Sequence, residues 1–105
     1  MIELNKENFD AEVVQHQGVV LVDYWGPKCE HCMALMPDVE ELASKYGDKV
    51  KFAKVNASEN RRLCIAQKVL GLPVIQFWVN GEKVAELTKD DATRDNIEAK
   101  LKELA

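Results

Sequence analysis

The sequence of 105 residues has only three cysteines, no long hydrophobic run and no excess of positive charge. Its longest apolar run, Val19–Val22, is far too short to cross a bilayer. The net charge of −4 gives no electrostatic basis for binding to nucleic acid or to an anionic membrane. Because no basic start and apolar run follow Met1, we expect no secretion signal and a cytoplasmic location.

The composition is that of a folded protein. Apolar residues make up 47% of the chain and charged residues 30%, and the two signs of charge are interspersed. At this length we expect a single domain over residues 1–105, and a monomer is the default assembly. Three cysteines do not form the scaffold of a small secreted domain. A close Cys-x-x-Cys pair indicates redox chemistry or metal binding instead.

The hydrophobic pattern predicts alternating strands and helices. Strands are expected around 2–4 and over 19–25, 50–55, 74–79 and 82–87, the last two joined by the turn Asn80-Gly81. Helices are expected over 5–15, from the cysteine pair to Gly47, over 59–69 and at the C-terminus. This order predicts an α/β fold with a central mixed sheet of four to five strands and helices on both faces.

The same periodicity predicts which helical side chains face inward. In the four helices, in chain order, these are Phe9, Val13 and Val14; Leu35, Val39, Leu42, Ala43 and Tyr46; Leu63, Ala66 and Val69; Ile97, Leu101 and Leu104.

Cys29-Glu30-His31-Cys32 lies where a predicted buried strand meets a long predicted helix, which is the context of a redox-active pair. At a helix start, free backbone N–H groups and the helix dipole stabilise a thiolate on Cys29 by roughly 1 kcal/mol. Cys32 lies one turn further along, within disulfide reach and more buried. We therefore predict that Cys29 attacks a substrate disulfide and that Cys32 resolves the mixed disulfide.

Asp23 interrupts the apolar strand just before the pair, and it is the candidate base for deprotonating Cys32. A buried carboxylate with a raised pKa suits proton transfer near neutral pH. The alternative is a capped or solvated strand end. The apolar residues on both sides of Asp23 favour burial.

A zinc site is the alternative interpretation of the pair. Zinc needs four ligands, and beyond the pair only Cys64, His16 and His31 remain. We therefore expect no metal and no cofactor. Cys64, flanked by Leu63 and Ile65, is expected to be a small packing residue rather than a regulatory thiol.

Four motifs resemble the thioredoxin family in order and spacing: Val22-Asp23-Tyr24-Trp25, the Cys-x-x-Cys pair, Pro37 and Gly71-Leu72-Pro73. The resemblance covers nearly the whole chain. It implies the thioredoxin fold and a thiol–disulfide oxidoreductase, an electron carrier that reduces protein disulfides.

The resemblance also implies a substrate-binding turn. The peptide bond before Pro73 would be cis and would face the cysteines. The backbone of Leu72, between Gly71 and Pro73, would pair with an extended substrate segment, and Val74 stands where the family usually has Thr. Without the resemblance, Pro73 would be interpreted as a simple turn proline.

Two further residues gain a role from the resemblance. Trp25 would pack beneath the active-site loop, and Lys54 would lie close to the buried Asp23 and support it. On its own, Lys54 would be interpreted as an exposed strand residue.

The neighbours of the cysteines depart from the family. The family usually has Trp-Cys-Gly-Pro-Cys-Lys where this chain has Lys28-Cys29-Glu30-His31-Cys32-Met33. Lys28 and an imidazolium on His31 would make the disulfide more oxidising, and Glu30 would oppose this. We expect a reduction potential a few tens of millivolts above the roughly −270 mV of thioredoxins and below the roughly −180 mV of protein disulfide isomerase. Alternatively, His31 is a solvent-facing spacer without redox effect.

A narrower resemblance lies away from the cysteines, over 34–43, 61–63, 67–73 and 88–94. These segments look like the thioredoxins of glycine, sarcosine and betaine reductase systems in anaerobic amino-acid-fermenting bacteria. The resemblance implies electron delivery to a selenoprotein-dependent amino-acid reductase, besides other disulfide-containing proteins. The electrons would come from a flavin-dependent thioredoxin reductase that uses NADPH.

Two other functions compete with the electron carrier. A disulfide oxidant or isomerase is favoured by His31 and disfavoured by the missing signal sequence. A non-catalytic binding module with the thioredoxin fold would not need both cysteines, Asp23 and the Gly-Leu-Pro turn together.

Overall fold

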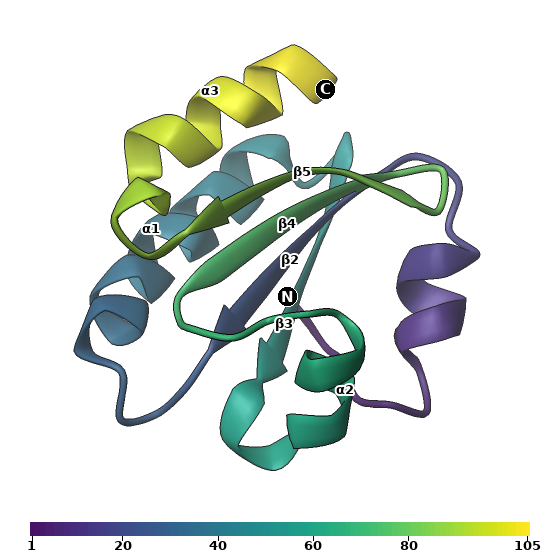
Figure 1. Cartoon of the computed structure of the whole chain (residues 1–105). Coiled ribbons are helices and arrows are strands. Elements are labelled where there is room, and N and C mark those ends of the chain that lie inside the picture. Colours follow the sequence, from purple (N-terminus) through teal and green to yellow (C-terminus); the bar gives the residue numbers. More distant parts are fainter.

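The computed structural model describes all residues, 1–105, around a five-stranded mixed sheet in the order β1-β3-β2-β4-β5 (Figure 1). β1 and β2 are each parallel to β3, whereas β4 is antiparallel to β2 and to β5. The predicted mixed sheet is thereby confirmed. The strands are β1 Ile2–Glu3, β2 Val19–Trp25, β3 Val50–Asn56, β4 Val74–Val79 and β5 Glu82–Thr88.

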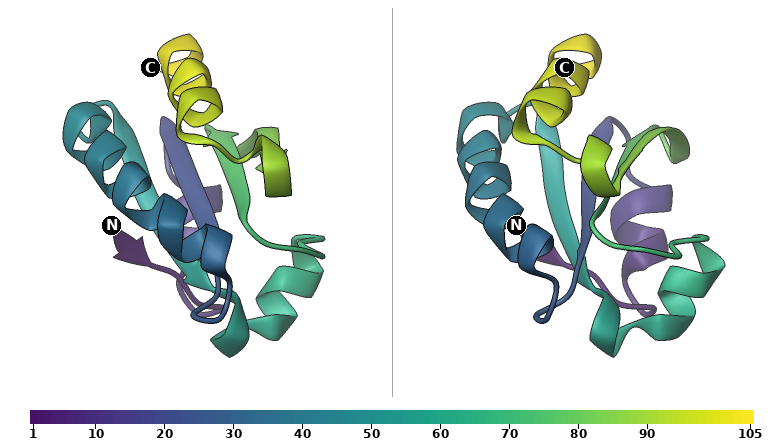
Figure 2. Two further views of the ribbon diagram at one scale, coloured as in Figure 1. Left: turned by 90° about the vertical axis from the view of Figure 1, so that its left-hand side faces the viewer. Right: turned by 60° about the vertical axis from the view of Figure 1, so that its left-hand side comes forward.

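Helices cover both faces of the sheet (Figures 1 and 2). The long helices α1 and α3 lie together on one face, and the N-terminal helical segment η1 and the short α2 lie on the other. Two 3₁₀ turns, η2 and η3, follow β3 and β5. The bounds are η1 Asp10–Val14, α1 Glu30–Tyr46, η2 Ala57–Glu59, α2 Arg61–Ala66, η3 Lys89–Asp91 and α3 Arg94–Leu104.

β2 is the middle strand and contributes to both cores. Val20, Val22 and Tyr24 pack on the face covered by η1 and α2. Leu21 packs on the opposite face, against α1 and α3. Because side chains alternate along a strand, Asp23 projects to the same face as Leu21, the face that α1 covers.

The first helix is π-helical over Asp10–Val14 rather than α-helical as predicted. Its start is as expected, because the Asn5 side chain accepts hydrogen bonds from the backbone N–H groups of Glu7 and Asn8. The chain then widens into a π-helical turn in which the Gln15 N–H donates to the Asp10 carbonyl at 2.8 Å. The wider turn changes which residues share a face. Phe9 and Val13 are buried as predicted, but Val14 is 38% exposed, which corrects its predicted inward position.

The helix predicted over 59–69 is shorter. η2 precedes it, and Lys68 ends it in the left-handed region with φ 59°. The N–H groups of Lys68 and Val69 bond the Ile65 and Cys64 carbonyls, which is the Schellman ending usually marked by glycine. Ala66 is consequently exposed, contrary to the prediction, whereas Cys64 is buried as a packing residue.

A buried polar network lies on the η1/α2 face of the sheet. Gln76, fully buried in β4, accepts hydrogen bonds through Oε1 from the Tyr24 hydroxyl at 2.9 Å and the Trp78 indole N–H at 3.1 Å. Its amide nitrogen donates to Glu86 at 2.9 Å. Burial, together with the proximity of Cys64 and Glu86, raises the pKa of the Tyr24 hydroxyl. It therefore stays protonated and donates.

We predict that Gln76→Leu lowers the free energy of unfolding by about 2–4 kcal/mol, because two buried donors, on Tyr24 and Trp78, lose their acceptor. Tyr24→Phe should cost only about 1 kcal/mol, because Gln76 keeps the indole donor. Urea unfolding at constant m-value measures both changes. A Gln76→Leu variant with an unchanged free energy of unfolding would show that the network does not stabilise the fold.

Candidate functional site

The two cysteines lie at the start of α1. Cys29 is the N-cap residue, and its Sγ accepts a hydrogen bond from the backbone N–H of Cys32 at 3.2 Å. Their Cα atoms are 5.2 Å apart and their sulfurs form a disulfide. Cys32 is 1% exposed, whereas Cys29 is half-buried and lines an open groove. The accessible sulfur is therefore that of Cys29.

Asp23 is buried next to the centre of the sheet. It is 1% exposed, and its Oδ2 has no hydrogen-bond partner. Burial raises the pKa of its carboxyl to about 7, against the opposing effect of the Lys54 ammonium. Asp23 and Lys54 are register partners on β2 and β3, so their side chains project to the same face.

Lys54 lies partly at the surface, on the face of the sheet to which Asp23 projects. Its side chain is 25% exposed, and its ammonium lies 4.0 Å from Glu3 Oε1. The same ammonium lies 5.9 Å from the centre of the Trp25 ring. Trp25 is half-buried at the end of β2, and its indole N–H is buried without a hydrogen-bond acceptor. A cavity of about 340 Å³ borders Lys54, Trp25 and Glu3.

The Leu72–Pro73 peptide bond is cis, and its loop lies next to the cysteine loop. Leu72 lines the same groove as Cys29, and Leu72 Cδ1 lies 3.2 Å from the point where a Cβ on Gly26 would stand. Pro73 and Val74 are buried, with Val74 paired to Tyr24 across the sheet. The structure therefore brings the cysteine motif and the cis-proline turn together, although Val74 lies 42 positions after Cys32 in the sequence.

The charged residues and the histidine beside and between the two cysteines all lie at the surface. Lys28 lines the groove together with Cys29. Glu30 is exposed in the first turn of α1. His31 is exposed and faces a different hollow, of about 220 Å³, which it shares with Thr93 and Arg94 at the start of α3.

Sequence reasoning missed two residues near the site. Arg61, the first residue of α2, lines the same groove as Lys28 and Cys29. Leu70 is 93% exposed just before the Gly71-Leu72-Pro73 turn. No local pattern distinguishes either residue, because each position depends on how α2 and its following loop pack beside the cysteine loop.

Cys64 lies apart from the pair, in the core on the η1/α2 face. Burial raises the pKa of its thiol, which keeps it protonated. No group of three or more His, Cys, Asp or Glu side chains could hold a metal ion. None of the helices has the length and apolar character needed to cross a membrane.

Comparison with known proteins assigns the chain to one family. The family model described as Thioredoxin matches residues 1–103. A thioredoxin of Peptoclostridium acidaminophilum is 56% identical over 101 residues, which cover 96% of this chain and 92% of the relative. The chain belongs to the thioredoxin family. A thioredoxin of Acetoanaerobium sticklandii is 51% identical and covers 97% of both chains, and one of Buchnera aphidicola is 35% identical over 81% of this chain and 79% of its own length.

Membership in the thioredoxin family establishes the kind of chemistry. Thioredoxins are thiol–disulfide oxidoreductases, and Cys29 and Cys32 are the Cys-x-x-Cys pair of this chain. The predicted fold and the predicted class of activity are confirmed. The two relatives above 50% identity come from anaerobic bacteria, as the resemblance implied.

We predict that Asp23→Asn stabilises the oxidised protein, and increasingly so as the pH rises. A carboxyl whose pKa is raised on folding stabilises the fold below its unfolded pKa, near 3.8, and this stability is lost as the pH rises through about 7. The variant's stability advantage should therefore grow by about 2–3 kcal/mol between about pH 5 and pH 8. Urea unfolding at both pH values measures it.

Lys54→Gln serves as the matched control for this prediction. It removes the charge that lowers the Asp23 pKa, so the loss of stability should move to higher pH. An advantage of Asp23→Asn that does not change with pH would mean that Asp23 is not the titrating group.

Proposed function

We propose that the chain is a reducing electron carrier in which Cys29 is the nucleophile and Cys32 the resolving cysteine. The observation that supports these roles is the difference in exposure between the half-buried Cys29 at the groove and the buried Cys32 behind it. The Cys29 thiolate attacks a substrate disulfide, forms a mixed disulfide and releases one substrate thiolate. Cys32 then attacks the Cys29 sulfur, which forms the internal disulfide and releases the second thiolate. Two electrons pass to the substrate.

Asp23 acts in this proposal as the proton acceptor and donor for Cys32. A carboxyl with a pKa of about 7 is present in both protonation states near neutral pH, which suits reversible proton transfer. It projects to the face covered by α1, the helix that carries Cys32. Lys54 supports it by opposing the full effect of burial on its pKa.

The cis-proline loop forms the substrate-binding backbone. No hydrogen bond joins the backbone N–H or C=O of Leu72 to the rest of the chain, so both groups are free to pair with an extended segment. Gly71 and Val74 flank this position, and Pro73 holds it beside the cysteines. Trp25 supports the loop from the end of β2.

The proposed setting is the cytoplasm, with a flavin-dependent thioredoxin reductase as electron donor and disulfide-containing proteins as acceptors. Among these acceptors we propose a selenoprotein-dependent amino-acid reductase of the glycine, sarcosine or betaine type. The support is the resemblance of segments outside the site, together with two relatives above 50% identity from anaerobic bacteria.

We predict that Cys32→Ser accumulates a stable mixed disulfide with a small disulfide-containing protein and that Cys29→Ser forms none, because the half-buried Cys29 lines the groove whereas Cys32 is buried. Asp23→Asn should form the mixed disulfide at a near-normal rate but resolve it at least about tenfold more slowly. Quenched-flow alkylation with mass analysis separates the two steps. Asp48→Asn, which changes an exposed carboxylate, should leave both unchanged.

The direction of electron flow is tested by the reduction potential of the pair, measured by equilibration in glutathione or dithiothreitol buffers. We expect a value between about −280 and −230 mV, which suits a reductant in the cytosol. A disulfide oxidant or isomerase, the second candidate suggested by Lys28 and His31, requires a value above about −190 mV. Such a value would overturn the proposed direction.

A further inference from the structure

The groove beside Cys29 is built by three segments that are distant in the sequence. It has a volume of about 660 Å³, within the range of sites that hold a small ligand or a short segment of chain. The loop between β2 and α1, η2 with the start of α2, and the cis-proline loop each contribute residues to its lining. Its lining residues are Gly26, Pro27, Lys28, Cys29, Ala57, Ser58, Arg61 and Leu72.

The charged side chains of this groove are of one sign. Lys28 comes from the loop between β2 and α1 and Arg61 from the start of α2, and no carboxylate lines the groove. Neither cation forms a salt bridge within the chain. The lining of the groove is therefore locally positive on a protein whose net charge is −4, and it includes the accessible Cys29.

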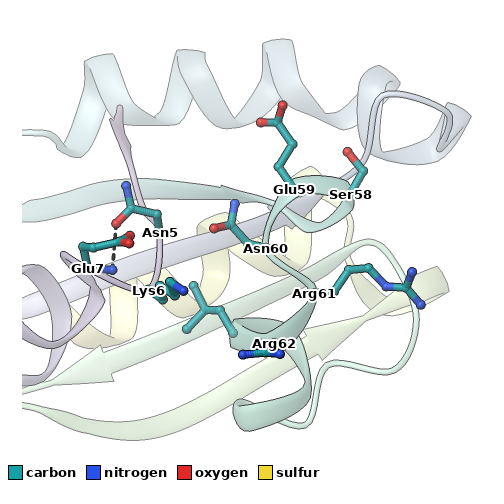
Figure 3. A pocket seen from close by; sticks show the side chains of 9 residues that line it. Asn5, Lys6, Glu7, Ser58, Glu59, Asn60, Arg61 and Arg62 are labelled. Atoms are coloured by element: carbon teal, nitrogen blue, oxygen red, sulfur yellow. Dashed lines mark hydrogen bonds between the residues drawn. The ribbon is translucent and has the colours of Figure 1, made fainter.

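Arg61 lines the groove of Cys29, whereas its neighbour Arg62 does not. Both border a polar pocket of about 460 Å³ that η2 and the start of α2 line together with the N-terminal segment, where Lys6, Glu7 and Glu59 also lie (Figure 3). In Figure 3 Arg61 extends away from Lys6 and Glu7, and it is Arg61 that also lines the groove of Cys29. Arg62 does not line that groove. The chain therefore contains a matched pair of arginines, one at the groove and one outside it.

We propose that the groove selects substrate segments that carry an acidic side chain close to the cysteine attacked by Cys29, and that Lys28 and Arg61 determine this specificity. The inference rests on the proposed reductase function. The substrate carboxylate would lie between the two cations, while Leu72 provides an apolar wall and a free backbone for the extended segment.

The selection acts on the first step of the exchange. The Cys29 thiolate forms a bond to one substrate sulfur, the substrate S–S bond breaks, and the other sulfur leaves as a thiolate that takes a proton from water. A carboxylate held between Lys28 and Arg61 accelerates this step by raising the fraction of encounters that bring the disulfide to Cys29. It changes none of the atoms that react.

The test compares two synthetic peptides with the same disulfide, one with Glu and one with Gln beside the attacked cysteine. With the dithiothreitol-reduced protein, the second-order rate constant for the Glu peptide should be about 3- to 10-fold larger at low salt, as expected for one or two exposed ion pairs. The ratio should approach one in about 0.5 M salt, because exposed charges are then screened.

The ratio of the two rate constants is the readout because it cancels any effect of a variant on the thiolate itself. Arg61→Gln should lower the ratio by about half or more, and Lys28→Gln with Arg61→Gln should bring it to about one. Arg62→Gln, with the same loss of charge outside the groove, should keep the wild-type ratio.

Two outcomes would overturn the inference: a wild-type ratio near one at low salt, or a preference that survives in the Lys28→Gln, Arg61→Gln variant. Both outcomes differ from a failure of the proposed reductase function. If that function failed, the reduced protein would leave both peptides and insulin disulfides intact. Reduction of both peptides at equal rates would leave the reductase function standing and remove only the acidic specificity.

Discussion

The structure depends on one central strand that is buried on both of its faces. β2 lies between β3 and β4, and its alternate residues enter two separate cores. A strand in this position cannot slip by one residue without exchanging the contents of both cores, so its register is fixed. Because the Cys29 loop leaves from the end of β2, the position of the accessible sulfur is fixed by the same packing. The cis-proline loop enters β4, the strand paired to β2, and is placed by the same register.

The buried polar side chains on the two faces of the sheet differ in their hydrogen bonding. Gln76, on the η1/α2 face, has hydrogen-bond partners for its oxygen and its nitrogen. On the α1 face, Asp23 Oδ2 has none, and burial outweighs the nearby Lys54 enough to raise its pKa to about 7. A shift of that size corresponds to roughly 4 kcal/mol of penalty on the ionised form. The unpaired carboxyl on the α1 face fits the proton-transfer role proposed for Asp23, since a proton acceptor of matched pKa requires incomplete compensation.

The parts of the fold that sequence could predict are those with a strong local signal. The apolar runs predict β2 and β4 with the bounds that the structure has. Asn80-Gly81 predicts the hairpin because this pair of residues tolerates the positive φ that a tight hairpin turn requires. In the structure the two φ angles are 50° and 83°. Prediction failed where a helix departs from the regular 3.6-residue period. The π turn rotates Val14 outward, and the left-handed Lys68 ends α2 with no glycine to mark it.

The chemistry of the site could also be predicted, but its surroundings could not. Cys29, Cys32 and Asp23 lie within ten residues of one another and have a local signature. The hydrogen bond that satisfies Gln76 spans 52 residues to Tyr24, so the sequence of β4 alone shows only a polar residue in an apolar run.

Arg61 and Lys28 illustrate the same limit and its consequence for specificity. They are separated by 33 positions in the sequence, yet they line one groove together with Cys29. The net charge of −4 would by itself suggest that acidic partners are repelled. At contact the local charges matter more, because the Debye length at physiological ionic strength is only about 8 Å and screens the rest of the surface. Two cations without a salt bridge, lining the groove of Cys29, are therefore among the charges that an approaching disulfide meets first. The cysteine pair supplies a chemistry common to the family, and the charges of the groove are where this chain can discriminate among disulfides.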